Sequence, residues 1–394
     1  MKNILFLSAS MPFPPIGGEK IRPFHFIKHL SAMGYKITIA AFTGSKSVSD
    51  SGSQFANVKM IGIKLPKYIS YLQCAGGLLR DLPLENSYFY SGRMKRAIEQ
   101  ELKIGNYDLI FCHLVRMAEY VKNYRGILKV LDMSDALSYR YGLSCRYRKW
   151  PFNMIESLES KRLKKFEPIF ASSFDLNLIS SSVDKEYLEK ELGISRLSLV
   201  ENGIDEEALV KGQGKFDNNK IVFFANMRTF HNVDAAIYFY KAIFPLIKKH
   251  NKDARFVIAG ANMPFVLRKL SGVDNSVQVY NNVEDIYALI KDSCVSVAPM
   301  RVAVGIQNKI IQSMAAGVPV VATRLGLGGI QANEGREILL ADNPEDFSEK
   351  VITLMQDHKL RSEIAASALS LIRDKYLWTG IVRGLEQKLL TLNN

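Results

Sequence analysis

Residues 295–323 read VSVAPMRVAVGIQNKIIQSMAAGVPVVAT, and this stretch decides the fold. It predicts a short apolar strand, a loop, a helix, a Gly-Val-Pro stop and a second apolar strand. On the helix, four apolar residues fall at the spacing of a buried face: Ile306, Ile310, Ile311 and Met314. A strand, a covering helix and another strand in this order indicate a parallel sheet of the α/β class.

A second face of the same helix carries Gly305, Lys309 and Gln312 at i, i+4 and i+7, with Asn308 beside them. A helix that only covers a sheet does not need a basic and amide stripe at its start. A helix whose N-terminus meets a diphosphate and whose next turn meets a ribose gains from one. Lys309 is therefore a candidate anion ligand, and the alternative is that Lys309 is merely solvated.

The length of 394 residues exceeds the usual size of one hydrophobic core, so two domains are expected. Four scattered cysteines without a CxxC pair favour reduced thiols in the cytoplasm over a disulfide framework or a zinc site. The opening MKNILFLSASMPFPP has a short apolar run that breaks at prolines, which predicts a first strand rather than a signal peptide. No stretch is apolar for long enough to span a membrane.

The net charge of +13 is unevenly distributed. Residues 1–200 contain 29 Lys and Arg against 18 Asp and Glu, so most of the excess lies there. Within this half, residues 145–167 combine seven Lys and Arg with Tyr147, Trp150 and Phe152. This segment is a candidate for contact with an anionic membrane surface, with a solvated charged helix as the alternative. We expect no nucleic-acid partner, because no recognised binding motif is present.

Strands and helices alternate along the chain and restart after ENGIDEEAL at 201–209. The alternation predicts two Rossmann-like domains facing across a cleft, formed by residues 1–200 and 201–375, with a C-terminal helix at 376–394 packing back on the first. The expected strands are Ile4–Ala9, Lys36–Ala41, Leu109–His113, Ile127–Leu131 and Leu176–Ser180, then Lys220–Ala225, Arg255–Ala259, Val277–Tyr280, Val295–Ala298 and Val318–Ala322. Ligands of such sheets bind beyond the carboxyl ends of the strands.

Several motifs, in order, resemble the GT-B-fold retaining glycosyltransferases of family 4, the glycogen-synthase-like group. They are MPFPPIGGEKIRPFHFIKHLSAMGYKITI (11–39), YDLIFCH (107–113), ENGID (201–205), FFANMRTFHNVDAAIYF (223–239), GIQNKIIQSMAAGVPVVAT (305–323) and YLWTGIVRGLEQKL (376–389). The resemblance extends over nearly the whole chain. It implies a nucleotide diphosphate sugar as the donor substrate, no other cofactor, and retention of anomeric configuration.

For the N-terminal domain, the resemblance places Gly17 and Gly18 over the donor pyrophosphate, with Glu19 and Lys20 at the edge of the loop toward the acceptor. A plain loop is the alternative. His113, at a strand end, would contact sugar or acceptor and contribute to the reaction, and a histidine satisfied by local backbone is the alternative. Two carboxylates after the next strand either bind acceptor hydroxyls or cap the following helix: Asp132 and Asp135.

In the C-terminal domain, Arg228 follows a strand and would clamp the diphosphate together with Lys309. Two cations could neutralise the leaving group without a metal, and we find no Asp-x-Asp pair that would hold one. Neighbouring candidates for donor contacts are Asn226, His231 and Asn232.

The chain departs from the family pattern at two positions. The family commonly carries two Glu eight residues apart around the donor helix, where this chain has Val304 and Gln312. Gln312 can still bond ribose hydroxyls, and backbone amides of Gly305 and Ile306 at the helix start could substitute for Val304.

The expected function is therefore a metal-independent transfer of sugar to a glycan or lipid-linked glycan acceptor in bacterial surface polysaccharide synthesis, as in capsule or O-antigen assembly. The protein would work in the cytoplasm or at the inner face of its membrane. The alternatives are a catalytically degenerate homologue that binds a nucleotide sugar or a partner, and a nucleotide-sugar epimerase of the same fold.

Overall fold

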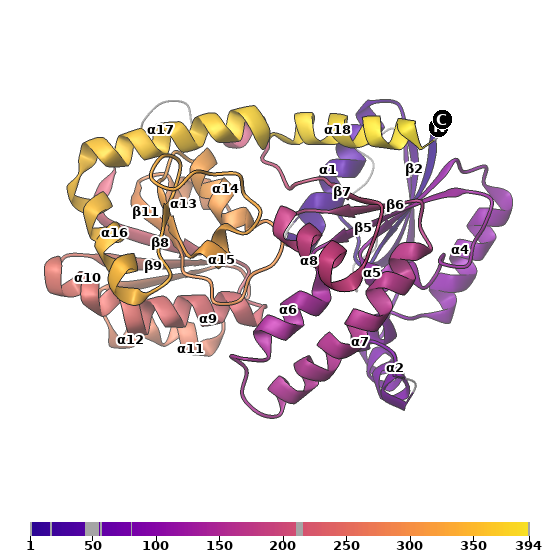
Figure 1. Ribbon diagram of the computed structural model, residues 1–394, viewed down its shortest axis with the longest axis horizontal. Coiled ribbons are helices and arrows are strands. Elements are labelled where there is room, and N and C mark those ends of the chain that lie inside the picture. The colour runs from indigo at the N-terminus through magenta and orange to yellow at the C-terminus, as the bar shows by residue number, and fades with distance from the viewer. Residues whose placement is uncertain are drawn as a thin grey trace. The chain divides into compact units, whose positions relative to one another are not determined.

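The computed structural model describes residues 2–15, 18–43, 55, 57–79, 81–209 and 216–392. This part of the chain divides into two compact units (Figure 1). Unit 1 comprises Met1–Glu201 and Val382–Asn394, and unit 2 comprises Asn202–Ile381. Each unit is built on one parallel sheet, which confirms the expected pair of Rossmann-like domains.

Unit 1 contains a seven-stranded sheet of order β3-β2-β1-β4-β5-β6-β7, all parallel. Its strands are β1 Asn3–Ser8, β2 Lys36–Thr43, β3 Val58–Lys64, β4 Leu109–His113, β5 Leu128–Ser134, β6 Leu176–Ile179 and β7 Leu197–Leu199. Its helices are α1 Gly18–Ala32, α2 Lys67–Leu79, α3 Leu84–Tyr88, α4 Gly92–Ile104, α5 Val115–Ala118, α6 Leu137–Ser144, α7 Phe152–Ser172 and α8 Ser182–Leu192. The order reverses direction between β1 and β4, so the loops after these strands meet at a topological switch point.

Unit 2 contains a six-stranded parallel sheet of order β10-β9-β8-β11-β12-β13. The strands are β8 Asp217–Phe224, β9 Arg255–Gly260, β10 Val277–Asn281, β11 Ser293–Ala298, β12 Val320–Ala322 and β13 Leu339–Leu340. Its helical segments are η1 Glu206–Ala208, α9 Phe230–Tyr238, η2 Phe239–Ile243, α10 Phe244–His250, α11 Phe265–Arg268, α12 Leu270–Val273, α13 Ile286–Ile290, α14 Asn308–Ala315, α15 Arg324–Leu327, α16 Pro344–Gln356 and α17 His358–Lys375.

The helix α18, Trp378–Thr391, begins in unit 2 and ends in unit 1, because the division between the units falls within it. Its first residue, Trp378, is almost fully buried, and the Ile204–Leu377 bridge ties the start of this segment to unit 2.

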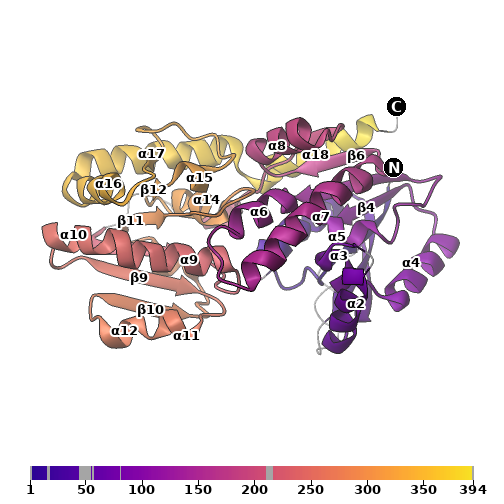
Figure 2. The ribbon, with the colours of Figure 1, turned by 60° about the horizontal axis from the view of Figure 1, so that its bottom comes forward.

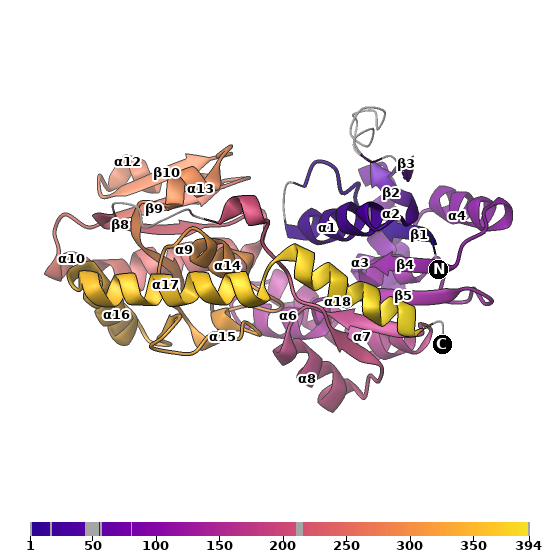
Figure 3. The same cartoon turned by 90° about the horizontal axis from the view of Figure 1, so that it is seen from above.

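The strand β8 shows how each unit 2 sheet face is filled. Successive side chains of a strand point to opposite faces. Ile221 and Phe223 pack in the cluster that holds Phe239 and Phe347 from η2 and α16, whereas Val222 and Phe224 pack with residues of α13. Helices of unit 2 lie on both sides of its sheet (Figures 2 and 3). Because both faces are covered, the strand reads as a continuous apolar run in the sequence.

Candidate functional site

The turn after β8 is fixed by a close approach to the turn after β9. A Cβ on Gly260 would lie 1.8 Å from the Ala225 carbonyl oxygen, and Gly260 has φ +143°, so only glycine fits. Past this contact, the Asn226 Oδ1 accepts hydrogen bonds from the Arg228 backbone N–H (3.2 Å) and from Asn262 Nδ2 (3.0 Å). The result is a rigid turn at the carboxyl edge of the sheet, from which the Arg228 side chain is exposed.

Asn232 reinforces this turn from the first turn of α9. Its Nδ2 donates to the Asn226 carbonyl oxygen and to Thr229 Oγ1, both at 2.9 Å. The Asn232 side chain is buried and used within the turn, so it supports Asn226 and Arg228 rather than reaching outward. His231 is half-buried and lies 3.3 Å from Thr229 Oγ1 through its Nε2.

The loop between β11 and α14 corrects one prediction. Gly305 and Ile306 were expected at the start of the helix, but α14 begins at Asn308. The reason is that Gly305 has φ +64°, which is outside the right-handed helical region, while the Ile306 side chain packs into the core. This loop also approaches another one closely, since a Cβ on Gly328 would lie 2.9 Å from the Gly305 carbonyl oxygen.

Lys309 is buried, so the interpretation that it is merely solvated is wrong. Its Nζ donates to Gln307 Oε1 at 2.9 Å, lies 3.8 Å from Met300 Sδ and 5.9 Å from the centre of the Phe223 ring. Among the described residues, no carboxylate forms an ion pair with Lys309. Burial lowers the pKa of Lys309 to about 7. A buried ammonium with only neutral neighbours gains from an anionic ligand, because burying an unpaired charge is costly.

Gln312, one turn further along α14, is half-buried and shares a side-chain hydrogen bond with the Tyr287 hydroxyl of α13. Burial raises the pKa of Tyr287 to about 12, so the hydroxyl stays protonated. Val304 is half-buried, and its carbonyl oxygen accepts a hydrogen bond from Gln307 Nε2 at 2.9 Å. The two positions that depart from the family pattern thus present an amide and an apolar side chain.

In unit 1, His113 ends β4 and is almost completely buried. Its Nδ1 lies 2.8 Å from Asp132 Oδ2, and its Nε2 lies 3.3 Å from the Glu19 carbonyl oxygen. The next residue, Leu114, has φ +72°, so the chain turns sharply directly after the histidine. His113 is therefore oriented by a carboxylate from the neighbouring strand, and not by local backbone alone.

Asp132 is fully buried and belongs to β5. Arg22 of α1 donates hydrogen bonds to both oxygens of Asp132 from Nε and Nη2, at 2.9–3.1 Å. Its Nη1 also donates to the Glu201 carbonyl oxygen at 3.1 Å. Burial alone would raise the pKa of Asp132, but the Arg22 charge and the His113 hydrogen bond outweigh it and hold this pKa at about 2. The prediction of an acceptor contact by Asp132 is corrected: its oxygens are committed to Arg22 and His113.

Asp135 follows β5 and is half-buried, and its Oδ1 accepts a hydrogen bond from Ser180 Oγ at 3.4 Å. Burial raises its pKa. The alternative that these carboxylates cap the next helix is wrong, because α6 starts after Ala136 and has no side-chain cap.

Gly18 is the first residue of α1 and is exposed, whereas Gly17 lies outside the described residues. Glu19 is exposed in the first turn, with its Oε2 3.4 Å from Arg116 Nη2, and Lys20 is half-buried. Within unit 1 the candidates of α1, β4 and β5 thus gather at the carboxyl edge of the sheet. The candidates of unit 2 gather in the same way after β8 and β11.

The sequence reasoning missed Arg22, Gln307 and Tyr287. Arg22 carried a usable signal, because it stands four residues before Phe26 on the apolar face of α1, where a charge is out of place, and its guanidinium lies 4.7 Å from the centre of the Phe26 ring. Gln307 and Tyr287 gave no signal, since their roles depend on contacts made only after the loops fold.

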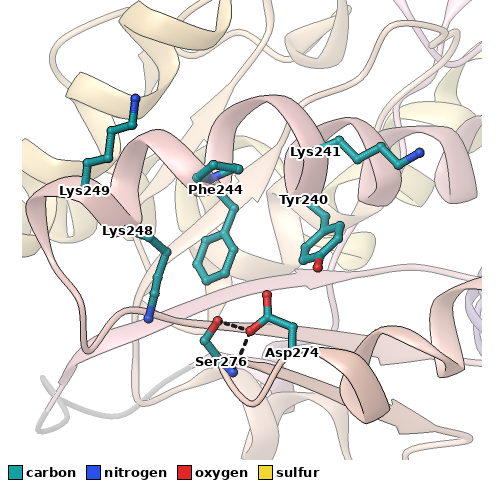
Figure 4. A pocket seen from close by; sticks show the side chains of 8 residues that line it. Tyr240, Lys241, Phe244, Lys248, Lys249, Asp274 and Ser276 are labelled. Carbon is teal, nitrogen blue, oxygen red and sulfur yellow. Dashed lines mark hydrogen bonds between the residues drawn. The ribbon is translucent and has the colours of Figure 1, made fainter.

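A pocket of about 550 Å³ lies elsewhere on unit 2, between the η2–α10 helix and the turn before β10 (Figure 4). Asp274 accepts hydrogen bonds from the backbone N–H and the hydroxyl of Ser276, and it also bonds to Tyr240. Because this turn precedes β10, the pocket lies toward the amino edge of the sheet, opposite the edge that carries Lys309. Asp274 is thus bonded to Ser276 and Tyr240 within the pocket, which is separate from the candidate site.

The helices of the described residues include none that is long and apolar enough to cross a lipid bilayer.

Comparisons with known proteins give a family match for part of the chain and relatives for most of its length. Residues 218–357 match the family model described as glycosyl transferases group 1. A Klebsiella pneumoniae protein, described as an uncharacterized 44.6 kDa protein in the cps region, is 22% identical over 410 residues, which cover 95% of this chain and 97% of that protein.

Two solved structures resemble the whole fold. Sucrose-phosphate synthase from Thermosynechococcus elongatus gives a TM-score of 0.75 at 13% identity, over 100% of this chain and 99% of that one. Anabaena HepE, solved with UDP and glucose, gives 0.68 at 15% identity, over 99% and 100% of the two chains. The fold is therefore GT-B, and the family match supports a glycosyltransferase domain at 218–357.

Proposed function

We propose that this protein is a glycosyltransferase that moves a sugar from a nucleotide diphosphate sugar to a glycan or lipid-linked glycan acceptor. The observation that carries the proposal is Lys309, a buried ammonium at the carboxyl edge of the unit 2 sheet with no carboxylate partner among the described residues. A diphosphate supplies the missing negative charge. The match of residues 218–357 to group 1 glycosyltransferases supports this assignment.

The chemistry requires stabilisation of the diphosphate as the sugar leaves it. Lys309, held by Gln307, would act as a fixed positive charge, and Arg228 on its rigid turn would bind the phosphates bidentately. Fixed charges in a buried site stabilise developing negative charge more strongly than water does. We propose that these cations suffice without a metal and that anomeric configuration is retained.

His113 would serve the acceptor or the transferred sugar. Its Nδ1 faces the ionised Asp132 and its Nε2 lies 3.3 Å from the Glu19 carbonyl oxygen, so a sugar or acceptor hydroxyl would reach Nε2 by replacing that carbonyl contact. Arg22 holds the Asp132 carboxylate in place, and that carboxylate in turn orients the His113 ring. Glu19, Lys20 and Asp135 remain proposed acceptor contacts.

The relative from a cps region supports a role in capsule or related surface polysaccharide synthesis. The complex of HepE with UDP and glucose makes UDP the first nucleotide to test. The test is calorimetry with UDP, GDP, ADP and CMP without metal. We expect selective binding of one nucleoside diphosphate, lost in Lys309→Met, and retained in Lys359→Ala, which changes a strongly exposed lysine of the same unit. No binding of any nucleotide would overturn the proposal.

A second candidate is a catalytically degenerate homologue, favoured by Val304 and by Gln312, whose amide is tied to Tyr287. Such a protein binds the nucleotide sugar yet releases no nucleotide when acceptors are supplied. An epimerase of the same fold would instead convert the donor sugar without any acceptor. Product analysis of one donor, with and without acceptor glycans, separates the three activities.

A further inference from the structure

The helix α2 of unit 1 turns its apolar side chains outward. Tyr68, Tyr71, Leu72 and Ala75 follow the i, i+3, i+4, i+7 spacing of one helix face, and all four are exposed. Tyr68 is 67% and Leu72 is 70% exposed. The helix contains no acidic residue and begins with an exposed Lys67. Soluble helices normally present their polar face to water, so this orientation indicates a partner.

The start of α7 repeats this feature. Five large side chains project into solvent there: Trp150, Phe152, Met154, Ile155 and Leu158. Trp150 is 75% exposed, which is unusual for the largest apolar side chain. Further along the helix, the same side carries two exposed lysines, Lys161 and Lys164, and the preceding loop exposes Arg146 and Lys149.

The acidic residues of α7 point the other way. Glu156, Glu159 and Glu167 are all buried. Asp81, an exposed acid close to this helix, is neutralised by Arg162 and Lys165, with contacts of 3.0 and 3.1 Å. The outward side of α7 is therefore basic and apolar, because the glutamates of this helix are buried inside unit 1.

One short segment of unit 1, at the start of α3, is hydrogen-bonded to both helices. Glu159 of α7 accepts hydrogen bonds from the backbone N–H groups of Leu84 and Glu85, at 2.8 and 3.0 Å, in the segment that follows α2. Cys74 of α2 donates to the Leu84 carbonyl oxygen at 3.6 Å, so the start of α3 bonds to both helices. The exposed residues of α2 and of 146–165 are here called the docking surface.

We propose that the docking surface binds an anionic lipid bilayer. Apolar and aromatic side chains would enter the region between headgroups and acyl chains, to a depth of about 5–10 Å. Tyr and Trp favour that boundary, and the flanking lysines and arginines match the negative charge of the lipid headgroups. A second copy of the chain fits less well, since pairing would bring two basic surfaces together. The inference does not depend on glycosyl transfer, so it is tested without a donor.

The experiment uses the full chain and vesicles of phosphatidylcholine, with or without phosphatidylglycerol. The sequence contains two tryptophans, and Trp378 is buried, so a lipid-induced blue shift of emission reports Trp150. We expect the blue shift and co-sedimentation only with phosphatidylglycerol, and both should weaken in salt. In Trp150→Phe the blue shift disappears while co-sedimentation persists.

Variants separate the two components of the surface. Replacing Lys161 and Lys164 by alanine should weaken the partition coefficient about 25-fold, at about fivefold for each charge removed. Tyr71→Ser with Leu72→Ser, and Ile155→Ser alone, should each weaken binding through lost apolar contact. All of these positions are exposed, so folding is preserved, and thermal unfolding checks this.

Matched controls lie on unit 2: Phe265→Ser, at a side chain that is 72% exposed, and Lys359→Ala. They should leave vesicle binding unchanged. Equal binding to neutral vesicles, or no binding to either kind, overturns the proposal. Concentration-dependent self-association without lipid that the docking-surface variants abolish would also overturn it and assign the surface to a second copy.

Discussion

The two units bury positive charge in different ways. In unit 1, Arg22 and His113 share the carboxylate of Asp132, so that the charges balance inside the protein. In unit 2, Lys309 has a neutral amide, a thioether and an aromatic ring as neighbours. The first arrangement is complete without a ligand and fixes a histidine ring. The second is complete only when an anion arrives, which is what a binding site for a diphosphate requires.

The largest effect is expected at Asp132. Asp132→Ala should destabilise the protein by about 3–5 kcal/mol, because Arg22 is left buried and unpaired. Urea denaturation measures the change. Asp135→Ala, on the same sheet edge, removes a 3.4 Å hydrogen bond from Ser180 rather than a bidentate ion pair, so it serves as the matched control and should cost much less. Similar losses in both variants would show that the closed network has no special role.

Acid should weaken the same network. The pKa of Asp132 is held at about 2 in the folded protein, below its usual value, so the carboxylate contributes stability that is fully present above about pH 4. That contribution is lost as the pH falls through about 2. Wild type should therefore lose stability across this range more steeply than Asp132→Asn, as measured by denaturation at several pH values.

Lys309→Met tests the opposite arrangement. Without nucleotide, the variant should be at least as stable as wild type near neutral pH, because a buried unpaired charge is replaced by an apolar side chain of similar length. The gain in unfolding free energy should be largest below pH 7, where wild type must bury the charged lysine. It should fade as the pH rises from 7 toward 10.5, because Lys309 is neutral in the folded protein there and the cost of deprotonating it falls with rising pH. A loss of stability as large as that of Asp132→Ala would show that Lys309, like Asp132, stabilises the protein without a ligand, and the contrast between the two units would be wrong.

Nucleotide binding should depend on pH through Lys309. Its pKa of about 7 means that above pH 7 the free protein holds it largely neutral, so a bound diphosphate must draw in a proton. Affinity should fall by up to about tenfold per pH unit above 7. Calorimetry in two buffers of different ionisation enthalpy at the same alkaline pH measures the proton uptake, which should be absent in Lys309→Met.

The smallest effect is expected at Gln312. Gln312→Glu can keep its bond with the Tyr287 hydroxyl and accept ribose hydroxyls more strongly, so nucleotide affinity should change by less than about tenfold. Tyr287→Phe reports how much of any change passes through that bond. Turnover that rises in Gln312→Glu would point to an eroded site, and turnover that falls would show that the amide is used.

Much of the fold followed from short-range patterns. The strand Leu109–His113 was predicted at its observed bounds, and most other predicted strands differ by one to three residues at an end. The strand β3 was missed, because it lies at the sheet edge with alternating partial exposure and lacks the continuous apolar run of the inner strands. The strands β7 and β13 were also missed, because each is too short to give a recognisable apolar run in the sequence.

The sequence by itself determined the parallel α/β architecture, the places where strands end, and the residue types at those ends, because apolar runs and turn residues are local properties. Only the tertiary structure decided what those residues do. It placed Arg22 against Asp132, it buried Lys309 with no acid paired to it in the described part of the chain, and it turned the apolar side of α2 outward. Burial and charge balance depend on neighbours that are distant in the chain, and residue spacing does not contain that information.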